Sequence, residues 1–175
     1  MNTTIRRATL KDADVLSALS KKTFYDTFTG TCTEDDMQQF LQAYFDLDIV
    51  KKELANENDL YFFIEVDGVP AGYLRLMEDY SNFPLMKQWK ALELKRIYID
   101  KLYHGKGLAQ VLMTFAENFA KEKKFEVLWL GVWEHNNRAI RFYEKMGFKD
   151  SGHTHDFPIG NTPQRDNWLW KFFEG

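Results

Sequence analysis

The sequence predicts a mixed α/β fold in which strands and helices are interleaved along the chain. Three observations predict it: amphipathic helical segments early in the chain, a strand–turn–strand pattern at 60–76, and alternating strands and helices thereafter. The chain has 175 residues, the length of one ordinary domain, and contains no internal repeat and no linker. We therefore expect residues 1–175 to form a single domain.

The first 56 residues are expected to form a short strand followed by two or three helices. Residues 4–8 have the composition of a strand, and Thr9 with Asp12 three residues later resembles a capping pair that opens a helix. Thr33 precedes three acids, which the positive end of a helix dipole favours, and it marks the next helix start.

Residues 60–76 predict a β-hairpin. Two apolar runs, 61–66 and 71–76, flank Asp67 and Gly68, a pair that favours the tight turn between antiparallel strands. The same reasoning predicts strands at 91–100, 127–132, 148–154 and 167–172 and helices at 107–123 and 137–146.

The strand at 91–100 changes its apolar parity half-way along. Leu92 and Leu94 occupy even positions, whereas Ile97 and Ile99 occupy odd ones. Because strand side chains alternate between faces, a single apolar face requires an extra residue at position 95 or 96, which is a β-bulge. A strand buried on both faces would also explain the pattern.

Tyr103–Ala109 forms a glycine-containing turn between that strand and the next helix. A helix N-terminus presents unpaired amides and partial positive charge, and Gly105 and Gly107 let a phosphate approach the backbone closely. The turn therefore predicts an anion site. A glycine turn that precedes a helix and binds no ligand is the alternative interpretation. It matches neither the P-loop nor the three-glycine dinucleotide motif. The helix that follows is expected to face inward through Leu108, Val111, Leu112 and Phe115.

The second motif is a helix with both of its caps. Asn136 ends a strand and is expected to cap the helix, and Gly147 is expected to terminate it. Ala139, Ile140 and Tyr143 fall on one face at helical spacing.

Together the two motifs resemble the GCN5-related N-acetyltransferase (GNAT) family, over nearly the whole chain. That family's coenzyme motif is Arg or Gln, two residues, Gly, one residue, then Gly or Ala; residues 104–109 match it except at His104. The resemblance implies a mixed, mostly antiparallel central sheet, splayed between two strands, with helices on both faces. It also implies an enzyme that transfers the acetyl group of acetyl-CoA to an amine.

The same resemblance implies that acetyl-CoA lies between the strands at 93–100 and 127–132. The pantetheine arm would pair with backbone freed by the bulge, Asn136 would hydrogen-bond that arm, and Tyr143 would lie beside the sulfur. The implied coenzyme residues are Ile97, Tyr98, Ile99, His104, Gly105, Lys106, Gly107, Leu108, Ala109, Asn136, Tyr143 and Lys145. Each of three residues also has a purely structural interpretation: Asn136 as a helix cap, Tyr143 as an aromatic residue of the core, and Lys145 as a lysine exposed to solvent.

Within the family, residues 23–28, 92–99 and 129–148 resemble the bacterial polyamine acetyltransferases of the PaiA type. Spermidine or spermine is therefore the implied acceptor. The acceptor end of the cleft is expected to include Tyr25, Asp26 and Phe28. An acetyltransferase for a protein N-terminus or another small amine, and a noncatalytic acyl-CoA sensor, remain alternatives.

Direct transfer to an amine calls for a base and an acid. An alkyl amine with a pKa near about 10.4 is protonated at neutral pH; Glu93, just before the bulge, is the first candidate base and Glu134 the second. Tyr143 suits the acid that protonates the leaving thiolate, because a phenol is still protonated at neutral pH. Cys32 offers a covalent route, but no histidine is near it in the sequence.

Composition argues against several classes of partner. The net charge of −3, with Lys and Arg dispersed among acids, argues against nucleic acid. No apolar run approaches the roughly 20 residues that cross a bilayer, and the single cysteine makes no internal disulfide, so a soluble cytoplasmic protein is expected. The four histidines lack metal-ligand spacing, so no metal is expected. The oligomeric state stays open, a homodimer included.

Overall fold

The structure is a computed structural model that describes residues 1–174. Short 3₁₀ helices lie at Leu10–Asp12, Pro84–Gln88 and Lys101–Tyr103. The other elements are, in chain order, β1 (Thr3–Arg7), α1 (Ala13–Phe28), α2 (Glu34–Phe45), α3 (Leu47–Ala55), β2 (Asp59–Val66), β3 (Val69–Met77), β4 (Ala91–Ile99), α4 (Leu108–Glu122), β5 (Val127–Trp133), α5 (Asn137–Lys145), β6 (Lys149–Asp156) and β7 (Arg165–Phe172).

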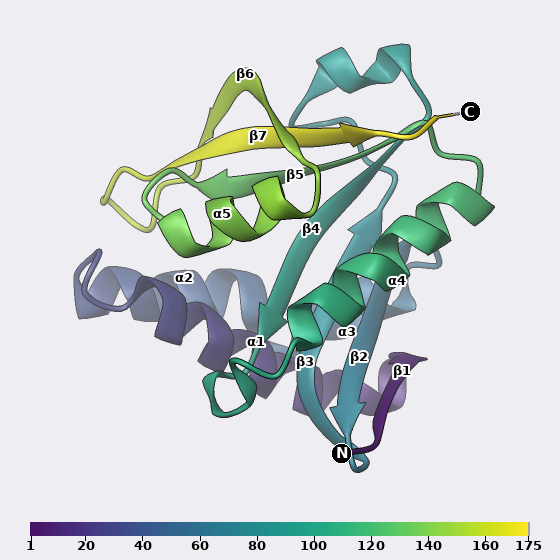
Figure 1. Ribbon diagram of the computed structural model, residues 1–175. Coiled ribbons are helices and arrows are strands. Elements are labelled where there is room, and N and C mark those ends of the chain that lie inside the picture. The colour runs from purple at the N-terminus through teal and green to yellow at the C-terminus, as the bar shows by residue number, and fades with distance from the viewer. Residues whose placement is uncertain (175) are drawn as a thin grey trace.

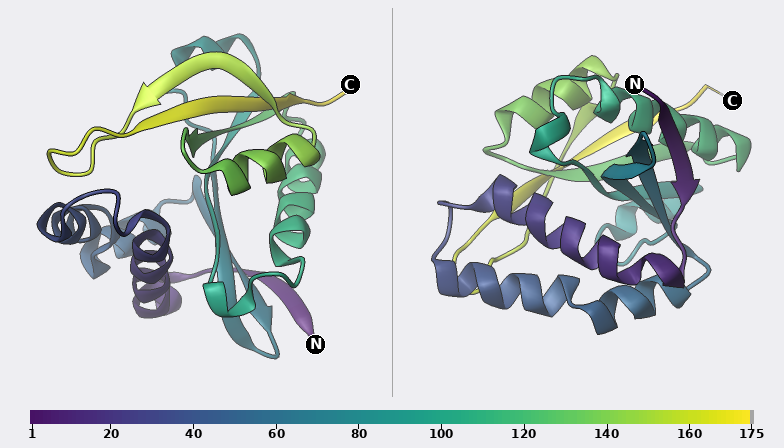
Figure 2. Two further views of the ribbon diagram at one scale, coloured as in Figure 1. Left: turned by 60° about the vertical axis from the view of Figure 1, so that its left-hand side comes forward. Right: turned by 90° about the horizontal axis from the view of Figure 1, so that it is seen from below.

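The described strands form one seven-stranded sheet in the order β1-β2-β3-β4-β5-β7-β6. Neighbouring strands are antiparallel except β4 and β5, which are parallel. Helices α4 and α5 cover one face of the sheet, and α1, α2 and α3 lie on the other (Figures 1 and 2). The predicted fold class is confirmed: a mixed, mostly antiparallel sheet with helices on both faces.

The sheet divides between β4 and β5. Their parallel pairing covers three positions and stops at Glu93 and Trp129. On their other sides, β4 continues to pair with β3 as far as Ile99, and β5 continues to pair with β7 as far as Trp133. The facing backbone edges of β4 and β5 therefore have no strand partner beyond Glu93 among the described residues, and a gap opens there.

The predicted β-bulge is present in β4. Arg75 of β3 pairs with Arg96, but the next residue, Leu76, pairs with Leu94, so Lys95 is the extra residue. The apolar residues on both sides of the bulge contact one core cluster, which also includes α4: they are Leu92, Leu94, Ile97 and Ile99. The bulge therefore corrects the change of parity seen in the sequence and keeps one face of β4 apolar.

Turn and cap signals also predicted the local structure. Asp67 and Gly68 have φ of +50° and +82°, as the predicted tight hairpin turn requires. Thr33 Oγ1 accepts a hydrogen bond of 3.1 Å from the Asp36 amide at the start of α2. Gly147 ends α5 with a φ of +95°.

The predicted inward face of α4 is wrong at one position. Val111 is 45% exposed, whereas Leu108 and Leu112 are buried as expected. Met113 and Ala116 are also buried, so the apolar stripe continues on the other side of Leu112. Within the described part of the chain, no helix is long and apolar enough to cross a membrane.

Candidate active site

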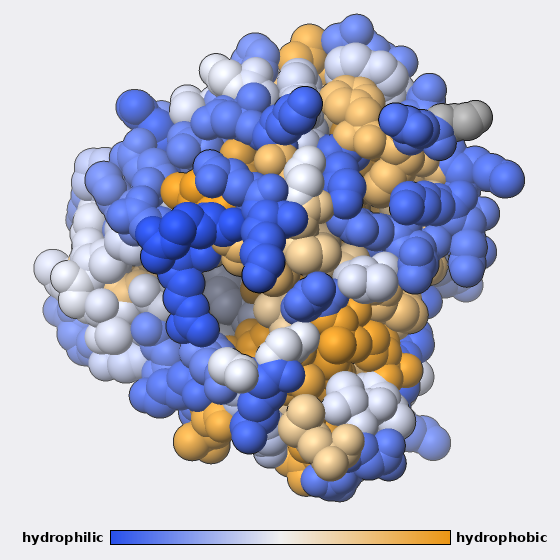
Figure 3. All heavy atoms as spheres, in the orientation of Figure 1, coloured by the Kyte–Doolittle hydropathy of each residue, from blue (hydrophilic) through white to orange (hydrophobic). Residues whose placement is uncertain are grey.

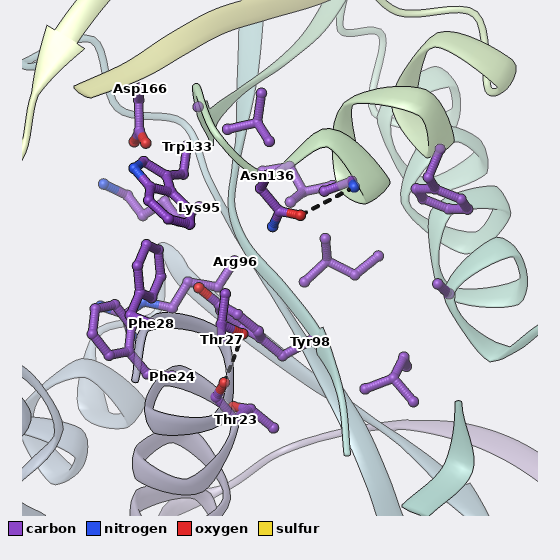
Figure 4. A pocket seen from close by; sticks show the side chains of 18 of the residues that line it. Thr23, Phe24, Thr27, Phe28, Lys95, Arg96, Tyr98, Trp133, Asn136 and Asp166 are labelled. Atoms are coloured by element: carbon purple, nitrogen blue, oxygen red, sulfur yellow. Dashed lines mark hydrogen bonds between the residues drawn. The ribbon is translucent and has the colours of Figure 1, made fainter. Parts of the chain in front are cut away.

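A cavity of about 1100 Å³ lies in the gap between β4 and β5. Its walls come from β4, the turn before α4, the first part of α5, the helices α1 and α2, and β7. In the space-filling view, the surface is hollowed between α5 and the helices α1 and α2, and the rim is largely hydrophilic (Figure 3). The cavity joins the glycine turn to an aromatic-lined end beside α1 (Figure 4).

The glycine turn has the geometry of an anion site. Gly105 and Gly107 have φ of +79° and +77°, and a Cβ added at either would meet no atom within 4 Å. Glycine is therefore required by the backbone conformation and not by crowding. The amides of residues 108–110, at the start of α4, donate to no backbone acceptor among the described residues. They are available to a phosphate at the positive end of the helix.

His104, the irregular position of the motif, connects two parts of the site. Its Nε2 lies 2.8 Å from the Ile99 carbonyl oxygen, and its Nδ1 lies 3.3 Å from Nη1 of Arg138. Because a guanidinium only donates, Nδ1 accepts and the imidazole proton is on Nε2. The Ile99 carbonyl oxygen therefore already accepts one hydrogen bond, from His104, and Ile99 as a coenzyme residue stays a prediction.

Asn136 caps α5 and also lines the cavity, while its contact with a pantetheine arm stays a prediction. Its Oδ1 accepts a hydrogen bond of 3.2 Å from the Ala139 amide and so caps α5. The amide nitrogen of the same side chain donates to no described residue, and Asn136 lines the cavity opposite the free edge of β4 (Figure 4). That edge includes Ile97 and Tyr98, which also line the cavity. A polar chain between the two strands would meet donors and acceptors on both sides.

Tyr143 is a buried residue of α5 that also lines the cavity; it is 8% exposed. Its hydroxyl makes no hydrogen bond within the described part of the chain. Burial raises the pKa of Tyr143, and the negative charge of Asp166 adds to the rise. The phenol therefore stays protonated at neutral pH and can donate a proton.

Four predicted site residues lie outside the cavity lining: Lys106, Lys145, Tyr25 and the second candidate base, Glu134. Lys106 and Lys145 are exposed, and Lys145 is the last residue of α5, whereas the cavity contacts that helix only as far as Tyr143. The Tyr25 hydroxyl is directed to α2, where it donates to Glu34 Oε2 at 3.2 Å. The other predicted site residues line the cavity.

Glu93, the first candidate base, lines the cavity but has a cationic neighbour. It is 6% exposed, and its Oε1 lies 3.3 Å from Nζ of Lys95, the bulged residue. Lys95 also pairs with Asp79 at 2.9 Å. Burial raises the pKa of Glu93, and Lys95 opposes that rise. Glu134, the second candidate, lies outside the lining and contacts His135 at 3.4 Å.

Asp166, which lines the cavity from β7, is not among the site residues predicted from the sequence. Burial raises the pKa of its carboxyl to about 7. The predicted strand began at Asn167, so Asp166 fell in a loop. Extending the strand by one residue would have placed Asp166 on the same face as Trp168 and Trp170, and that alternation was the available signal.

Aromatic rings line the end of the cavity beside α1. The Phe28 ring lies 5.2 Å from the Trp133 ring and 4.5 Å from the Phe24 ring, measured between centroids. Arg96 lies over the Phe45 ring at 4.6 Å from its centroid. This end therefore offers apolar and π surfaces to an acceptor.

Residues 21–148 match the model of the acetyltransferase (GNAT) family. The chain belongs to the GNAT family. It is 38% identical over 162 residues to an uncharacterized N-acetyltransferase of Lactobacillus delbrueckii subsp. lactis, which covers 92% of each chain. It is 32% identical over 125 residues to the spermidine N(1)-acetyltransferase of Escherichia coli, which covers 67% of this chain and 61% of that one.

Among solved structures, the fold matches a PaiA N-acetyltransferase from Thermoplasma acidophilum in complex with coenzyme A. The TM-score is 0.80 at 21% identity, and the match covers 99% of this chain and 100% of that one. As a GNAT protein, the chain is an acetyl-CoA-dependent N-acetyltransferase. The splayed strands, the glycine turn and the unpaired amides of α4 suit an elongated ligand that carries a diphosphate.

Replacing Gly107 by alanine is expected to raise the dissociation constant of CoA about tenfold. The left-handed conformation costs an L-residue about 1–2 kcal/mol, so the turn relaxes and its amides move away from the phosphate. Gly68→Ala is the matched control, since Gly68 has a φ of +82°, equally open surroundings and no place in the lining. Titration calorimetry that gives equal CoA affinities for the two variants would contradict the phosphate cradle.

Proposed function

We propose that this N-acetyltransferase acetylates a primary amine, with spermidine or spermine as the first choice, by direct attack in a ternary complex. The observation that carries the proposal is the continuity of the cavity from the glycine turn to the aromatic end beside α1. An amine at that end can reach a thioester while the coenzyme occupies the gap between β4 and β5.

When bound, acetyl-CoA supplies the acetyl group as an activated thioester. We assign its diphosphate to the backbone at Gly105–Gly107 and the first amides of α4, and its pantetheine arm to the β4 edge at Ile97 and Tyr98. The free amide nitrogen of Asn136 supports this second assignment, because it faces the cavity with no acceptor among the described residues.

Tyr143 is assigned the acid that protonates the leaving sulfur. Its raised pKa keeps the phenol protonated, and Tyr143 lines the cavity from α5. Glu93 is assigned the removal of a proton from the acceptor, directly or through water. Burial raises the pKa of Glu93, which makes it a stronger base than an exposed carboxylate once it is ionised.

The chemistry of the acceptor end favours a cationic alkyl amine. Carboxylates line it together with aromatic rings, and ammonium groups bind both. The likeness to the spermidine acetyltransferase of Escherichia coli supports a polyamine.

Arg96 favours a second candidate, a small amine that also carries a carboxylate. It lines the same cavity, donates to the Tyr61 hydroxyl at 3.2 Å and has no ion-pair partner among the described residues. A guanidinium without an ion-pair partner binds carboxylates well.

Thiol release from acetyl-CoA tests both candidates. We expect spermidine and spermine to release thiol with a kcat/KM at least about tenfold above that of L-alanine, because alanine brings a single ammonium group. A preference for alanine would select the second candidate. CoA binding with no thiol release from any amine of the panel would identify a noncatalytic sensor.

A further inference from the structure

One carboxylate of the cavity differs from the rest in having no cationic partner. Four carboxylates line the cavity. Three have partners: Asp26 pairs with Lys22 at 3.3 Å and Lys101 at 3.6 Å, Glu93 with Lys95 at 3.3 Å, and Asp156 with Arg165 at 3.5 Å. Asp166 has neither an ion pair nor a side-chain hydrogen bond within the described part of the chain. A half-buried carboxylate without partners is costly, so it calls for an explanation.

The local structure places this carboxylate on the wall of the acceptor end. Asp166 lies directly opposite Trp133 in the β5–β7 pairing, so both side chains are on the same face. Gly131 makes room for it: a Cβ at Gly131 would lie 2.9 Å from Asp166 Oδ2. The carboxylate points from β7 toward the Trp133 ring, and the Phe28 ring lies on the other side of Trp133 (Figure 4). A carboxylate beside aromatic rings is the environment that an alkyl ammonium group prefers.

Asp166 also lies near the reacting centre proposed above. Its charge contributes to the raised pKa of Tyr143 and of Tyr98, which lie on α5 and β4. Asp166 therefore acts electrostatically on two tyrosines that line the gap where the thioester would be.

We propose that Asp166 is the residue that binds the ammonium group of the acceptor, beside the Trp133 ring. The inference rests on the proposed acetylation of an amine and names the residue that recognises that amine. It assigns acceptor binding to Asp166 because the other three carboxylates are engaged within the chain. A diamine or polyamine fits this site because its ammonium charge offsets the unpaired carboxylate.

The central test compares wild type with Asp166→Asn, which keeps the shape and removes the charge. Asp150→Asn is the matched control, since Asp150 lies on β6 outside the lining and accepts from the Gly152 amide at 2.8 Å. We expect the KM for spermidine to rise about 10- to 100-fold in Asp166→Asn, with the KM for acetyl-CoA unchanged. An unchanged spermidine KM in an active Asp166→Asn enzyme would overturn the inference.

The shift in Tm caused by spermidine measures amine binding without the acetylation reaction. A failure of the proposed acetylation can therefore be told apart from a failure of the assignment of Asp166. With CoA bound, spermidine should raise the Tm of wild type and of Asp150→Asn, and raise that of Asp166→Asn far less. If no thiol is released but this difference persists, the acetylation proposal fails and the assignment of Asp166 stands. If spermidine stabilises wild type and Asp166→Asn equally, or stabilises neither, the assignment is wrong.

Unliganded stability separates a binding role from a structural one. Besides Trp133, the titratable groups close to Asp166 are His155, its partner in the β6–β7 pairing, and Tyr143 and Tyr98, whose pKa values its charge raises. The folded pKa of Asp166, about 7, exceeds its ordinary value of 3.8, so wild type loses stability as pH rises between those values. We expect Asp166→Asn to have the higher Tm at about pH 8, with a smaller difference at about pH 5. A lower Tm at both values would indicate a structural carboxylate.

Discussion

Replacing Tyr143 by phenylalanine is expected to lower kcat by about 100-fold or more while the dissociation constant of CoA stays within about twofold. Phenylalanine keeps the ring that packs in the core and removes only the hydroxyl. The residue lines the cavity, its hydroxyl makes no hydrogen bond within the described residues, and burial raises the pKa of its phenol. The leaving thiolate would then have to take its proton from water. Steady-state kinetics and CoA titration measure the two quantities.

Tyr80→Phe is the matched control for that experiment. The Tyr80 hydroxyl donates to Glu78 at 2.7 Å and lies outside the cavity lining, so its removal should leave kcat unchanged within about twofold. Equal turnover in Tyr143→Phe and wild type would remove Tyr143 from the mechanism. A parallel loss in both variants would point to a general effect on folding.

The sequence was sufficient for the parts of the site that depend on local rules. The bulge at Lys95 followed from alternation, because a change of apolar parity has few physical explanations in a strand. The turn at Gly105 and Gly107 and the cap at Asn136 likewise follow from residue types that suit one backbone geometry. Those elements lie where they were expected, although their ligands stay proposals.

The sequence was not sufficient for contacts between distant segments. His104 could not be expected to engage the Ile99 carbonyl and Arg138, because that arrangement depends on how β4, the turn and α5 meet. The role of Gly131 could not be predicted from the sequence either, because the glycine is needed only where Asp166 and Trp168 of another strand lie over it. No local pattern marks the point where β4 and β5 stop pairing. Tertiary packing decides all of these features.

Replacing Arg75 by methionine is expected to lower the free energy of unfolding by about 3–5 kcal/mol at neutral pH. Arg75 holds Asp59 with two hydrogen bonds, of 2.8 Å and 2.7 Å, and Asp59 is 3% exposed. Glu53 lies 3.4 Å from the same guanidinium. Methionine fills similar space but leaves the buried carboxylate without its partner. That loss costs far more free energy of unfolding than the loss of an exposed ion pair. Equilibrium unfolding in urea measures the loss.

Arg6→Met provides the contrast, because Arg6 has a comparable pair with Asp12 at 2.8 Å but its side chain is 42% exposed. That change should cost about 1 kcal/mol or less. Combining Asp59→Leu with Arg75→Met should recover most of the stability, since a buried ion pair is often replaceable by apolar groups. Similar losses for Arg75→Met and Arg6→Met, or no recovery in the double variant, would show that the loss does not come from the unpaired Asp59.

The same pair also bears on the active site, because Arg75 lies opposite Arg96 at the bulge of β4. If the Asp59–Arg75 pair fixes that part of β3, its loss should disturb the backbone that frames Lys95 and Arg96. The double variant should then fold stably yet show a raised KM for the amine, with CoA affinity kept by the glycine turn at the other end of the cavity. A double variant with wild-type amine KM would show that the bulge holds its geometry without the pair.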